Sequence, residues 1–283
     1  MSNPARDAVE PLLAAKEAAL AEWLRAHGPV AIGYSGGVDS AFLAVAARET
    51  LGREGVLAII GRSPSYPEQQ WLAAREVALE FDVPVLELDT AELDDPRYAA
   101  NPSDRCYFCK TELWGRVVPV AHARGFRTVA DGTNADDRGD WRPGARAAGE
   151  HEVASPLAEL GFTKSDIRLS SRARGIPTWE QPSSPCLASR LPYGTAVTLE
   201  RLRQIERAEA ALRALGVAGD LRVRYHEELA RVELGAGELP KWLAADRAAA
   251  MRAAVCAAGF ERVAIDLGGF RSGSLNVLHG VTR

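Results

Sequence analysis

Apolar residues recur along the first half of the chain in two patterns, one with helical spacing and one in short uninterrupted runs. The helical spacing covers five segments: 8–26, 40–50, 67–81, 111–124 and one that opens at Thr163 with Asp166 in its first turn. The short apolar runs, which are typical of buried strands, occupy 29–34, 56–60, 85–88 and 127–130. Strands that alternate with helices predict an α/β fold, in which a parallel sheet has helices on both faces.

Repeated prolines between 175 and 192 exclude a helix there and indicate a connector between two domains. We therefore expect one domain over 1–178, and a second over 179–283 that begins with the connector. The second domain contains expected helices at 199–215 and 240–258 and expected strands at 221–225, 231–234 and 263–267. This order predicts a small α+β domain for substrate binding or for oligomerisation.

Composition narrows the class of protein. The 283 residues are 47% apolar and 25% charged, as in an ordinary globular protein that buries a core. The net charge of −4 supplies no general positive field, so we expect neither nucleic acid nor a membrane surface as a partner. No apolar run approaches the roughly 20 residues of a membrane span, and the N-terminus lacks the apolar core of a signal peptide, so we expect a cytoplasmic protein.

A glycine-containing segment, Ser35-Gly36-Gly37-Val38-Asp39-Ser40, lies between an expected strand and an expected helix. Its glycines allow positive φ and a close approach of backbone N–H groups to an anion, and the helix N-terminus adds partial positive charge. Asp39 could hold Mg²⁺, and the hydroxyls of Ser35 and Ser40 can donate to phosphate oxygens. The segment has neither the lysine of a Walker A loop nor a GxGxxG pattern, so it predicts a phosphate loop of another kind. A capped strand-to-helix turn is the alternative interpretation.

This loop resembles the PP-loop of the ATP pyrophosphatases, which cleave ATP between the α and β phosphates and adenylate a substrate oxygen. The resemblance extends from the start of the chain to the expected helix at Thr163. It implies that the loop binds ATP with Mg²⁺ and that Asp39 takes part in catalysis. It also implies that Gly132, in the turn sequence 131–134, and Ser63, after the second strand, contact the adenine nucleotide. Taken alone, each of these two positions also fits an ordinary loop.

Four cysteines are too few for a disulfide framework in a chain of this length, which leaves metal binding, catalysis or inert packing. Cys106 and Cys109 have a C-x₂-C spacing that lets two thiolates face one metal ion or cluster, although a redox pair or two buried thiols would have the same spacing. Cys186 lies in the connector, and Cys256 lies on an Ala-rich helix where core packing is expected. Three thiolates are one short of a closed zinc site, but they leave one iron of a four-iron cluster open for chemistry.

More specific motifs occur in the connector and the second domain: 185–194 (PCLASRLPYG), 222–226 (RVRYH) and 266–276 (DLGGFRSGSLN). With them the sequence resembles the LarE family over nearly its whole length. That family comprises ATP-dependent sulfurtransferases that make the thiocarboxylates of the nickel-pincer nucleotide cofactor. The resemblance implies that a carboxylate of pyridinium-3,5-biscarboxylic acid mononucleotide is adenylated by ATP and then receives sulfur. It further implies a homo-oligomer and transfer of the product to a nickel-inserting enzyme.

Two branches of that family obtain the sulfur differently. In one branch, the cysteine at the position of Cys186 gives up its own sulfur and is left as dehydroalanine. In the other, cysteines at the positions of Cys106, Cys109 and Cys186 are ligands of a 4Fe-4S cluster that passes on a bound sulfide. This chain has all three cysteines, so the resemblance favours the cluster branch, with Cys186 counted among the catalytic residues.

Charged residues of the second domain suggest where the substrate binds. Arg222 and Arg224 alternate along an expected strand and so point to one face, where paired guanidinium groups suit a substrate phosphate. Arg190 is expected to play a similar part, and a solvated strand face is the alternative for the pair. Glu209 and Glu233 could bind a second metal ion near the substrate, although a surface charge explains each equally well.

Three other functions share parts of this pattern. Some PP-loop enzymes with three cysteines thiolate tRNA, but the net charge and the lack of a basic tail argue against that partner. Amide ligation, as in NAD or GMP synthesis, gives no reason for the three cysteines. A nucleotide-sensing module would bind ATP without cleaving it, so release of pyrophosphate distinguishes it from an enzyme.

Overall fold

The computed structural model describes residues 4–139, 143–182 and 184–271 of the chain. Its backbone contacts define two compact units. Unit 1 consists of 1–63, 68–91 and 106–183, and unit 2 consists of 64–67, 92–105 and 184–283. Two short segments from the first half of the chain, 64–67 and 92–105, therefore belong to unit 2, although both lie within the expected first domain over 1–178.

Unit 1 is built on a parallel sheet whose strands, within the described residues, follow the order β3-β2-β1-β4. The strands are β1 (Val30–Gly33), β2 (Val56–Arg62), β3 (Val85–Asp89) and β4 (Thr128–Ala130). β1 is central and buried along most of its length, which explains why its sequence is an uninterrupted apolar run. The predicted parallel sheet is confirmed.

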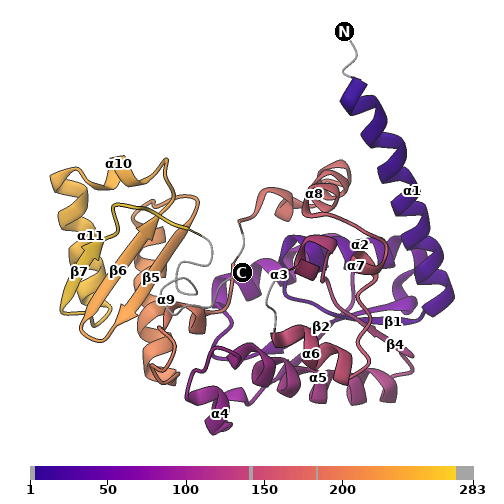
Figure 1. Cartoon of the computed structure of the whole chain (residues 1–283), viewed down its shortest axis with the longest axis horizontal. Helices are drawn as coiled ribbons and strands as arrows, with labels where there is room; N and C mark the ends of the chain where they lie inside the picture. Colours follow the sequence, from indigo (N-terminus) through magenta and orange to yellow (C-terminus); the bar gives the residue numbers. More distant parts are fainter. Residues whose placement is uncertain (1–3, 140–142, 183, 272–283) are drawn as a thin grey trace. The chain divides into compact units, whose positions relative to one another are not determined.

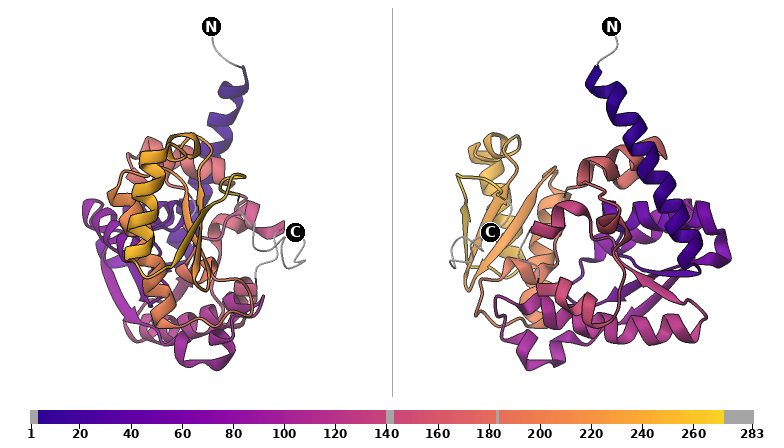
Figure 2. Two further views of the ribbon diagram at one scale, coloured as in Figure 1. Left: turned by 90° about the vertical axis from the view of Figure 1, so that its left-hand side faces the viewer. Right: turned by 45° about the vertical axis from the view of Figure 1, so that its right-hand side comes forward.

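Helices cover both faces of this sheet (Figures 1 and 2). On one face lie α5 (Arg105–Ala123) and α6 (Pro143–Glu150), which bury Trp114, Val117 and Ala147 against the strands. On the other face lie α1 (Pro4–His27), α2 (Val38–Leu51) and α8 (Lys164–Ala173). Unit 1 also contains α3 (Glu68–Glu80) and the single-turn helix α7 (Pro156–Glu159). The helices on two faces confirm the predicted α/β class.

Two expected helices differ from those in the structure. α5 begins at Arg105, six residues earlier than the expected start at 111, so that Cys106 and Cys109 are helical. The aromatic and cysteine residues of this turn have weak helix propensity, and tertiary contacts hold it instead. The helix expected over 240–258 is two helices, α10 (Leu239–Trp242) and α11 (Ala245–Ala257), because Ala244 adopts an extended conformation between them.

Unit 2 contains a three-stranded sheet in the described residues, in the order β5-β6-β7. β5 (Leu221–His226) is antiparallel to β6 (Leu229–Leu234), which is parallel to β7 (Arg262–Ile265). α9 (Leu199–Ala214) and α11 bury the apolar side chains of the sheet, such as Val223 and Val232. Because side chains alternate along a strand, the arginines at even positions of β5 occupy the opposite face. Unit 2 also includes the short helix α4 (Pro96–Ala99).

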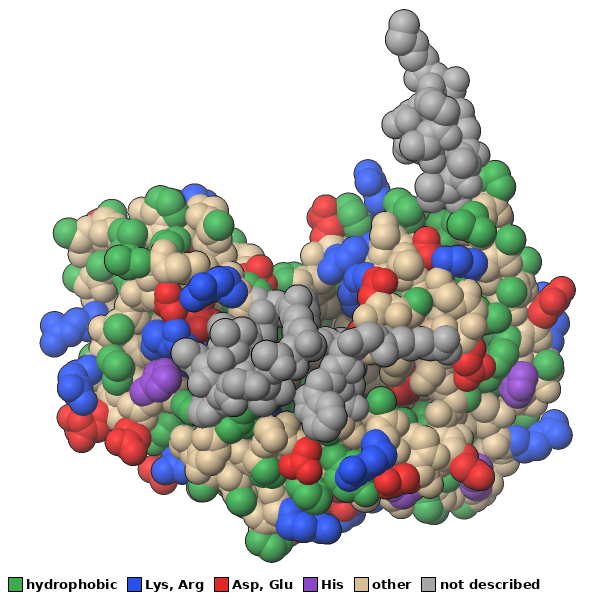
Figure 3. Space-filling view, viewed as in Figure 1, with side chains coloured by type: hydrophobic (Ala, Val, Ile, Leu, Met, Phe, Trp, Pro, Cys, Tyr) green, Lys and Arg blue, Asp and Glu red, His purple; other side chains and the backbone are tan. Residues whose placement is uncertain are grey.

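The described surface carries mixed charge. On the face drawn in Figure 3, Lys and Arg side chains are interspersed with Asp and Glu over the described residues. Within the described residues, no helix combines the length and the apolar character that crossing a bilayer requires.

Candidate active site

The loop between β1 and α2 is held by close packing and hydrogen bonds. Gly36 has a φ of +66°, and a Cβ atom there would lie 2.3 Å from the Cβ of Ala74 in α3. The Ser40 hydroxyl accepts from the Ser35 N–H at 3.2 Å and donates to the Gly37 carbonyl at 3.2 Å. Only glycine therefore fits at position 36, and the loop is fixed in front of the first N–H groups of α2. Val38 is buried beneath it.

The turn after β4 packs directly on the first turn of α2. A Cβ atom at Gly132 would lie 2.8 Å from the Ser40 backbone nitrogen. Asn134 is buried and directs its Nδ2 toward Asp39 Oδ1 at 3.4 Å. Both segments follow strands of the parallel sheet, so they meet at its carboxyl edge, where open α/β sheets bind ligands. Ser63 follows β2 and is half-buried.

Lys164, the first residue of α8, brings a positive charge to this loop. Its Nζ lies 2.5 Å from Asp39 Oδ2, and the two side chains are 36% and 22% exposed. The helix start is fixed by a reciprocal capping box between Thr163 and Asp166. Lys16 of α1 adds contacts of 2.7 Å from its Nζ to the Gly161 carbonyl and to Asp166 Oδ2. Lys164 is therefore presented to the loop from a well-anchored helix N-terminus.

The glycine loop itself lacks a Walker A lysine, and Lys164 was not among the residues predicted for the site. A signal was available, because the capping pattern Thr163-x-x-Asp166 places Lys164 at the first helical position. What the sequence could not show is that the start of α8 lies beside α2, since the contact joins residues that are 125 positions apart.

The residues of this loop fit a nucleotide triphosphate with Mg²⁺. The close packing of Gly36 on Ala74 fixes the loop before α2, and α2 contributes its N-terminal N–H groups for an anion. Asp39 supplies a carboxylate, the ligand type that Mg²⁺ prefers, and Lys164 supplies a cation for phosphate oxygens.

Cys106 and Cys109 lie near the start of α5. They are three residues apart, about one helical turn, and so share a face of that helix. Farther along α5, the Trp114 ring occupies the space that a Cβ at Gly33 would need, and Leu113 does the same at Gly61. These glycines lie near the ends of β1 and β2, so the turn that precedes them along α5 extends to the carboxyl edge of the sheet.

Cys106 is exposed and Cys109 is half-buried. Cysteine thiolates are ligands of zinc and of iron–sulfur clusters, so two cysteines on one face at the start of α5 fit part of the donor set of a metal cluster. The third expected ligand, Cys186, belongs to unit 2, where it precedes a short 3-10 helix at Leu187–Arg190.

Within the described residues, no three or more His, Cys, Asp and Glu side chains gather closely enough to hold a metal ion. The cluster therefore stays a prediction. Cys256 is half-buried, with its Sγ 3.8 Å from the Glu261 carbonyl, so it lies at the margin of unit 2 and not in the core as expected.

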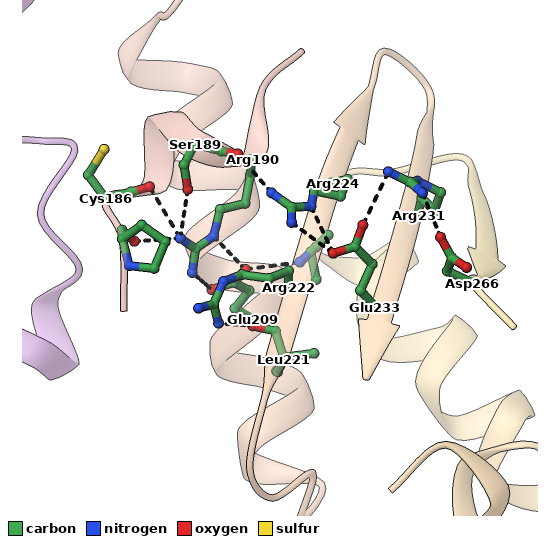
Figure 4. Close-up of polar contacts among 12 residues, drawn as sticks. Cys186, Ser189, Arg190, Glu209, Leu221, Arg222, Arg224, Arg231, Glu233 and Asp266 are labelled. Carbon is green, nitrogen blue, oxygen red and sulfur yellow. Dashed lines mark hydrogen bonds and ion pairs between the residues drawn. The ribbon is translucent and has the colours of Figure 1, made fainter. Parts of the chain in front are cut away.

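Arg190 is fixed on unit 2 by a two-pronged ion pair (Figure 4). Its Nε and Nη2 each lie 2.9 Å from an oxygen of Glu209, and the Arg190 side chain is only 2% exposed. Its Nη1 donates to the carbonyls of Pro185, at 2.5 Å, and of Cys186, at 3.2 Å. Glu209 Oε1 also accepts from the Val223 N–H at 2.9 Å, so this carboxylate joins α9, β5 and the connector.

Arg224 belongs to a second chain of ion pairs on the same unit (Figure 4). Its Nε and Nη2 donate to Glu233 Oε2 at 3.0 and 2.8 Å, and its Nη1 donates to the Ser189 carbonyl at 2.9 Å. Glu233 Oε1 lies 3.2 Å from Arg231 Nη2, and Arg231 Nη1 donates to Asp266 Oδ2 at 2.6 Å. Both glutamates expected near a second metal ion thus hold arginines, and their role as metal ligands stays a prediction.

Arg222 adds a third buried guanidinium group near the first two. Burial, followed by the neighbouring Arg190 charge, lowers the pKa of Arg222 to about 10. Its Nη1 donates to the Leu221 carbonyl at 2.6 Å, and its guanidinium lies 4.9 Å from the centre of the Phe270 ring. Arg190, Arg222, Arg224 and Arg231 face three carboxylates here, so these residues leave a net positive charge that suits an anion.

The third specific motif is described only in part. Asp266–Arg271 lies within the described residues, and 272–276 lies outside them. His226, at the end of β5, was noted only as part of a motif. Burial and the nearby Arg231 and Arg224 lower its pKa, so it is neutral beside the arginines at neutral pH.

Comparisons with known proteins agree with this geometry. Residues 17–103, which contain the glycine loop, match the NAD synthase family. The chain is 34% identical over 265 residues to pyridinium-3,5-bisthiocarboxylic acid mononucleotide synthase of Lactiplantibacillus plantarum, covering 93% of this chain and 95% of that protein. It is 41% identical over 245 residues to the uncharacterized protein slr1717 of Synechocystis sp., covering 87% and 91%. It is 31% identical over 205 residues to the uncharacterized protein MJ0830 of Methanocaldococcus jannaschii, covering 72% and 77%.

The parallel sheet with its glycine loop, together with these matches, defines an enzyme: a sulfurtransferase of the adenylating, ATP pyrophosphatase type. The similarity to the synthase extends through both units of the chain and includes the connector. The chain belongs to the LarE family.

Proposed function

We propose that this protein uses ATP to convert the carboxylates of pyridinium-3,5-biscarboxylic acid mononucleotide into thiocarboxylates, with sulfur supplied through a 4Fe-4S cluster. The observation that carries the cluster assignment is the placement of the exposed Cys106 and the half-buried Cys109 on one face at the start of α5, near the edge where the sheet ends. The similarity to the synthase supports the substrate.

The first step activates a carboxylate, which is a poor acyl donor because its charge repels nucleophiles and its oxygen leaves poorly. A carboxylate oxygen attacks the α phosphorus of ATP, the bond to the β-phosphate oxygen breaks, and pyrophosphate departs. The product is an acyl-adenylate. A sulfide nucleophile then attacks the carbonyl carbon, and AMP leaves with the oxygen that joined it to the acyl group. The thiocarboxylate thus exchanges one oxygen for one sulfur.

In this step, Mg²⁺ would replace Lys164 as the partner of Asp39. In the structure, the carboxylate and the ammonium neutralise each other, and both remain partly exposed. Mg²⁺ that arrives with ATP would take the carboxylate as a ligand and release Lys164 to the β and γ phosphates. Lys164 then stabilises the charge of the departing pyrophosphate together with the N–H groups of α2.

The arginines of unit 2 hold the substrate in this proposal. Its phosphate binds Arg190, Arg222 and Arg224, and the guanidinium groups of Arg190 and Arg224 are already oriented by Glu209 and Glu233. Orientation before binding lowers the entropy that the complex must lose. A second metal ion at Glu209 and Glu233 would compete with these ion pairs.

Cys106, Cys109 and Cys186 would hold the cluster through their thiolates. A 4Fe-4S cluster with three protein ligands supplies an open iron on which a sulfide can be carried for transfer. If the sulfur instead came from Cys186 itself, each chain would act once, and neither Cys106 nor Cys109 would be required.

Iron and acid-labile sulfide analysis of anaerobically purified protein tests this proposal. We expect both elements in the wild type and in Cys256→Ala, a half-buried cysteine outside the expected set, and their loss in Cys106→Ala and Cys186→Ala. A wild-type protein without iron or sulfide after reconstitution would contradict the cluster. The mass of Cys186 after turnover separates the two sulfur sources, since a sacrificial reaction removes its sulfur atom.

The proposed partners follow from the same substrate. We propose that a small nucleotide is bound and that nucleic acid and membranes are not. The protein would act in the cytoplasm as a homo-oligomer, and its product would pass to a nickel-inserting enzyme.

A further inference from the structure

A closed ring of hydrogen bonds joins four residues of unit 1 beside the glycine loop. Asn134 directs its Nδ2 toward Asp39 Oδ1 at 3.4 Å, and its Oδ1 accepts from the Asp136 N–H at 2.9 Å. Asp136 Oδ2 in turn accepts from the Lys164 backbone N–H at 2.8 Å. Lys164 Nζ, which lies 2.5 Å from Asp39 Oδ2, completes the ring. The turn after β4 is therefore connected to the first turns of both α2 and α8.

The turn after β4 is also fixed by contacts outside the ring. Asp131 Oδ1 accepts from the Thr133 N–H at 3.0 Å and from the Ser155 hydroxyl at 2.8 Å, and its Oδ2 accepts from the Thr133 hydroxyl at 2.8 Å. The Ala135 N–H donates to the Phe162 carbonyl at 2.8 Å. These contacts do not use the side chains of the ring, so the turn keeps this support when one ring residue is replaced.

The Asn134 amide has a single orientation in this ring. The side chain is buried, and a reversed amide would set its NH₂ group against the Asp136 N–H and its oxygen against the Asp39 carboxylate. A buried amide costs free energy unless its hydrogen bonds are made. Asn134 therefore holds one oxygen of Asp39 while the other oxygen faces Lys164.

Asp136 acts on the other part of the ring, where α8 begins. The Lys164 N–H belongs to the first turn of that helix and has no acceptor within it, so the acceptor must come from outside. Asp136 supplies it, whereas the Thr163 hydroxyl accepts from the Asp166 N–H. The two carboxyl and hydroxyl caps thus serve different N–H groups, and the cap from Asp136 connects the helix start to the ring.

We propose that Asn134 and Asp136 are positioning residues for the activation of ATP. Asn134 orients the Asp39 carboxylate for Mg²⁺, and Asp136 holds the start of α8, from which Lys164 reaches the phosphates. The inference rests on the proposed function, in which the ion pair between Asp39 and Lys164 opens when ATP arrives. Placement matters at that moment, because a displacement of about 1 Å can cost on the order of 100-fold in rate.

Two double-mutant cycles test this inference through the affinity of the full-length chain for ATP with Mg²⁺, measured by isothermal titration. Asn134→Ala should weaken ATP binding by about ten-fold, and Asp136→Ala by about three-fold, since the Asp136 side chain is exposed. Asn134→Ala should have almost no effect in an Asp39→Ala background, and Asp136→Ala almost none in a Lys164→Met background. In each background the group to be positioned has been removed.

A conservative variant and a stability control complete the test. Asp136→Asn keeps an oxygen that accepts from the Lys164 N–H, so it should recover most of the affinity without a negative charge. A direct role of the Asp136 charge in metal binding predicts no such recovery. Val117→Ala removes buried methyl groups from α5 and should lower the melting temperature while ATP affinity stays unchanged.

Losses of affinity that disappear in the matched backgrounds, together with recovery in Asp136→Asn, support the inference. Losses by the same factor in both backgrounds would overturn it, because the two residues would then only stabilise the fold. Wild-type affinity in both alanine variants would also overturn it. Where a background variant binds ATP too weakly to titrate, or Asn134→Ala does not fold, a failure of Asp136→Asn to recover decides against the inference.

The binding of ATP requires neither the pyridinium nucleotide nor a cluster, so this inference and the proposed function fail separately. Thiocarboxylate formation by a protein whose losses are additive in both cycles would contradict the inference alone. Cycles of the expected form in a protein that makes no thiocarboxylate would contradict the proposed function alone.

Discussion

The two units carry positive charge for anions in different ways. In unit 1, the glycine loop relies on backbone N–H groups and on a single lysine, whose partner Asp39 is 22% exposed. In unit 2, the arginines are buried and held by carboxylates, with Glu233 only 1% exposed. The exposed pair can exchange partners at small cost, whereas the buried pairs cannot. The difference matches the proposed function, in which the exposed pair meets ATP phosphates that are cleaved, and the buried arginines meet a substrate phosphate that takes no part in the reaction.

The largest expected effect comes from breaking the buried chain of ion pairs. Glu233→Ala would leave Arg224 without its carboxylate in a buried position, and we expect a loss of about 3–5 kcal/mol in the free energy of unfolding. Chemical denaturation measures it. Glu228→Ala is the matched control, because Glu228 pairs with Arg262 at the surface and should cost under about 1 kcal/mol. Equal losses of stability in the two variants would contradict the distinction between buried and exposed ion pairs.

Removal of the Lys164 charge should slow catalysis and leave the stability of the fold nearly unchanged. Lys164→Met deletes the cation that we place on the departing pyrophosphate, and we expect pyrophosphate release to slow by about 100-fold. The melting temperature should hardly move, since the Lys164–Asp39 pair is partly exposed. Lys241→Met, which removes an exposed lysine of unit 2, is the control for loss of a lysine. An unchanged rate of pyrophosphate release would mean that Lys164 does not contact the nucleotide.

Two glycines of unit 1 have left-handed backbone conformations. Replacing each by alanine separates the effect of backbone strain from the effect of a steric clash. Gly36 and Gly52 have φ values of +66° and +76°, but only at Gly36 would a Cβ meet another atom within 4 Å. Both Gly→Ala variants should lose about 1–2 kcal/mol through backbone strain. Gly36→Ala should also weaken ATP binding by about ten-fold, because the loop must move away from Ala74. Isothermal titration with ATP checks this, and equal affinities would show that the loop conformation is not required.

The smallest expected effect concerns His226, which faces Arg224, Arg231 and Glu233. Its pKa in the folded state is lowered, so below about pH 6.5 the unfolded chain binds a proton that the folded chain does not. Stability should therefore fall as pH decreases from that value toward the lowered pKa. His226→Gln should show a shallower decrease in melting temperature between pH 7 and pH 5. Parallel curves for the two proteins would contradict this role.

Local patterns were sufficient to predict much of unit 1. The run from β1 through the loop to α2 was predicted because its glycines, apolar strand and helix start are adjacent in sequence. The start of α5 was not, since its first turn contains residues of weak helix propensity and is held by contacts of Arg105 with distant residues. The placement of Lys164 beside Asp39, and of 92–105 within unit 2, depends on non-local packing in the same way.

The sequence identified the residues of the unit 2 site but not the ion pairs that join them. Alternation along β5 correctly placed Arg222 and Arg224 on one face. It could not show that Glu209 and Glu233 hold Arg190 and Arg224, because these ion pairs join α9 to the connector and β6 to β5.

The most direct test of the account is to incubate the anaerobic protein with ATP, Mg²⁺, sulfide and pyridinium-3,5-biscarboxylic acid mononucleotide and to follow the nucleotide by mass spectrometry. The account predicts replacement of carboxylate oxygen by sulfur, with pyrophosphate and AMP formed in step, more than one sulfur transferred per chain, and an unchanged mass at Cys186. Pyrophosphate release without any thiocarboxylate, or a yield limited to one sulfur per chain with loss of the Cys186 sulfur, would contradict it.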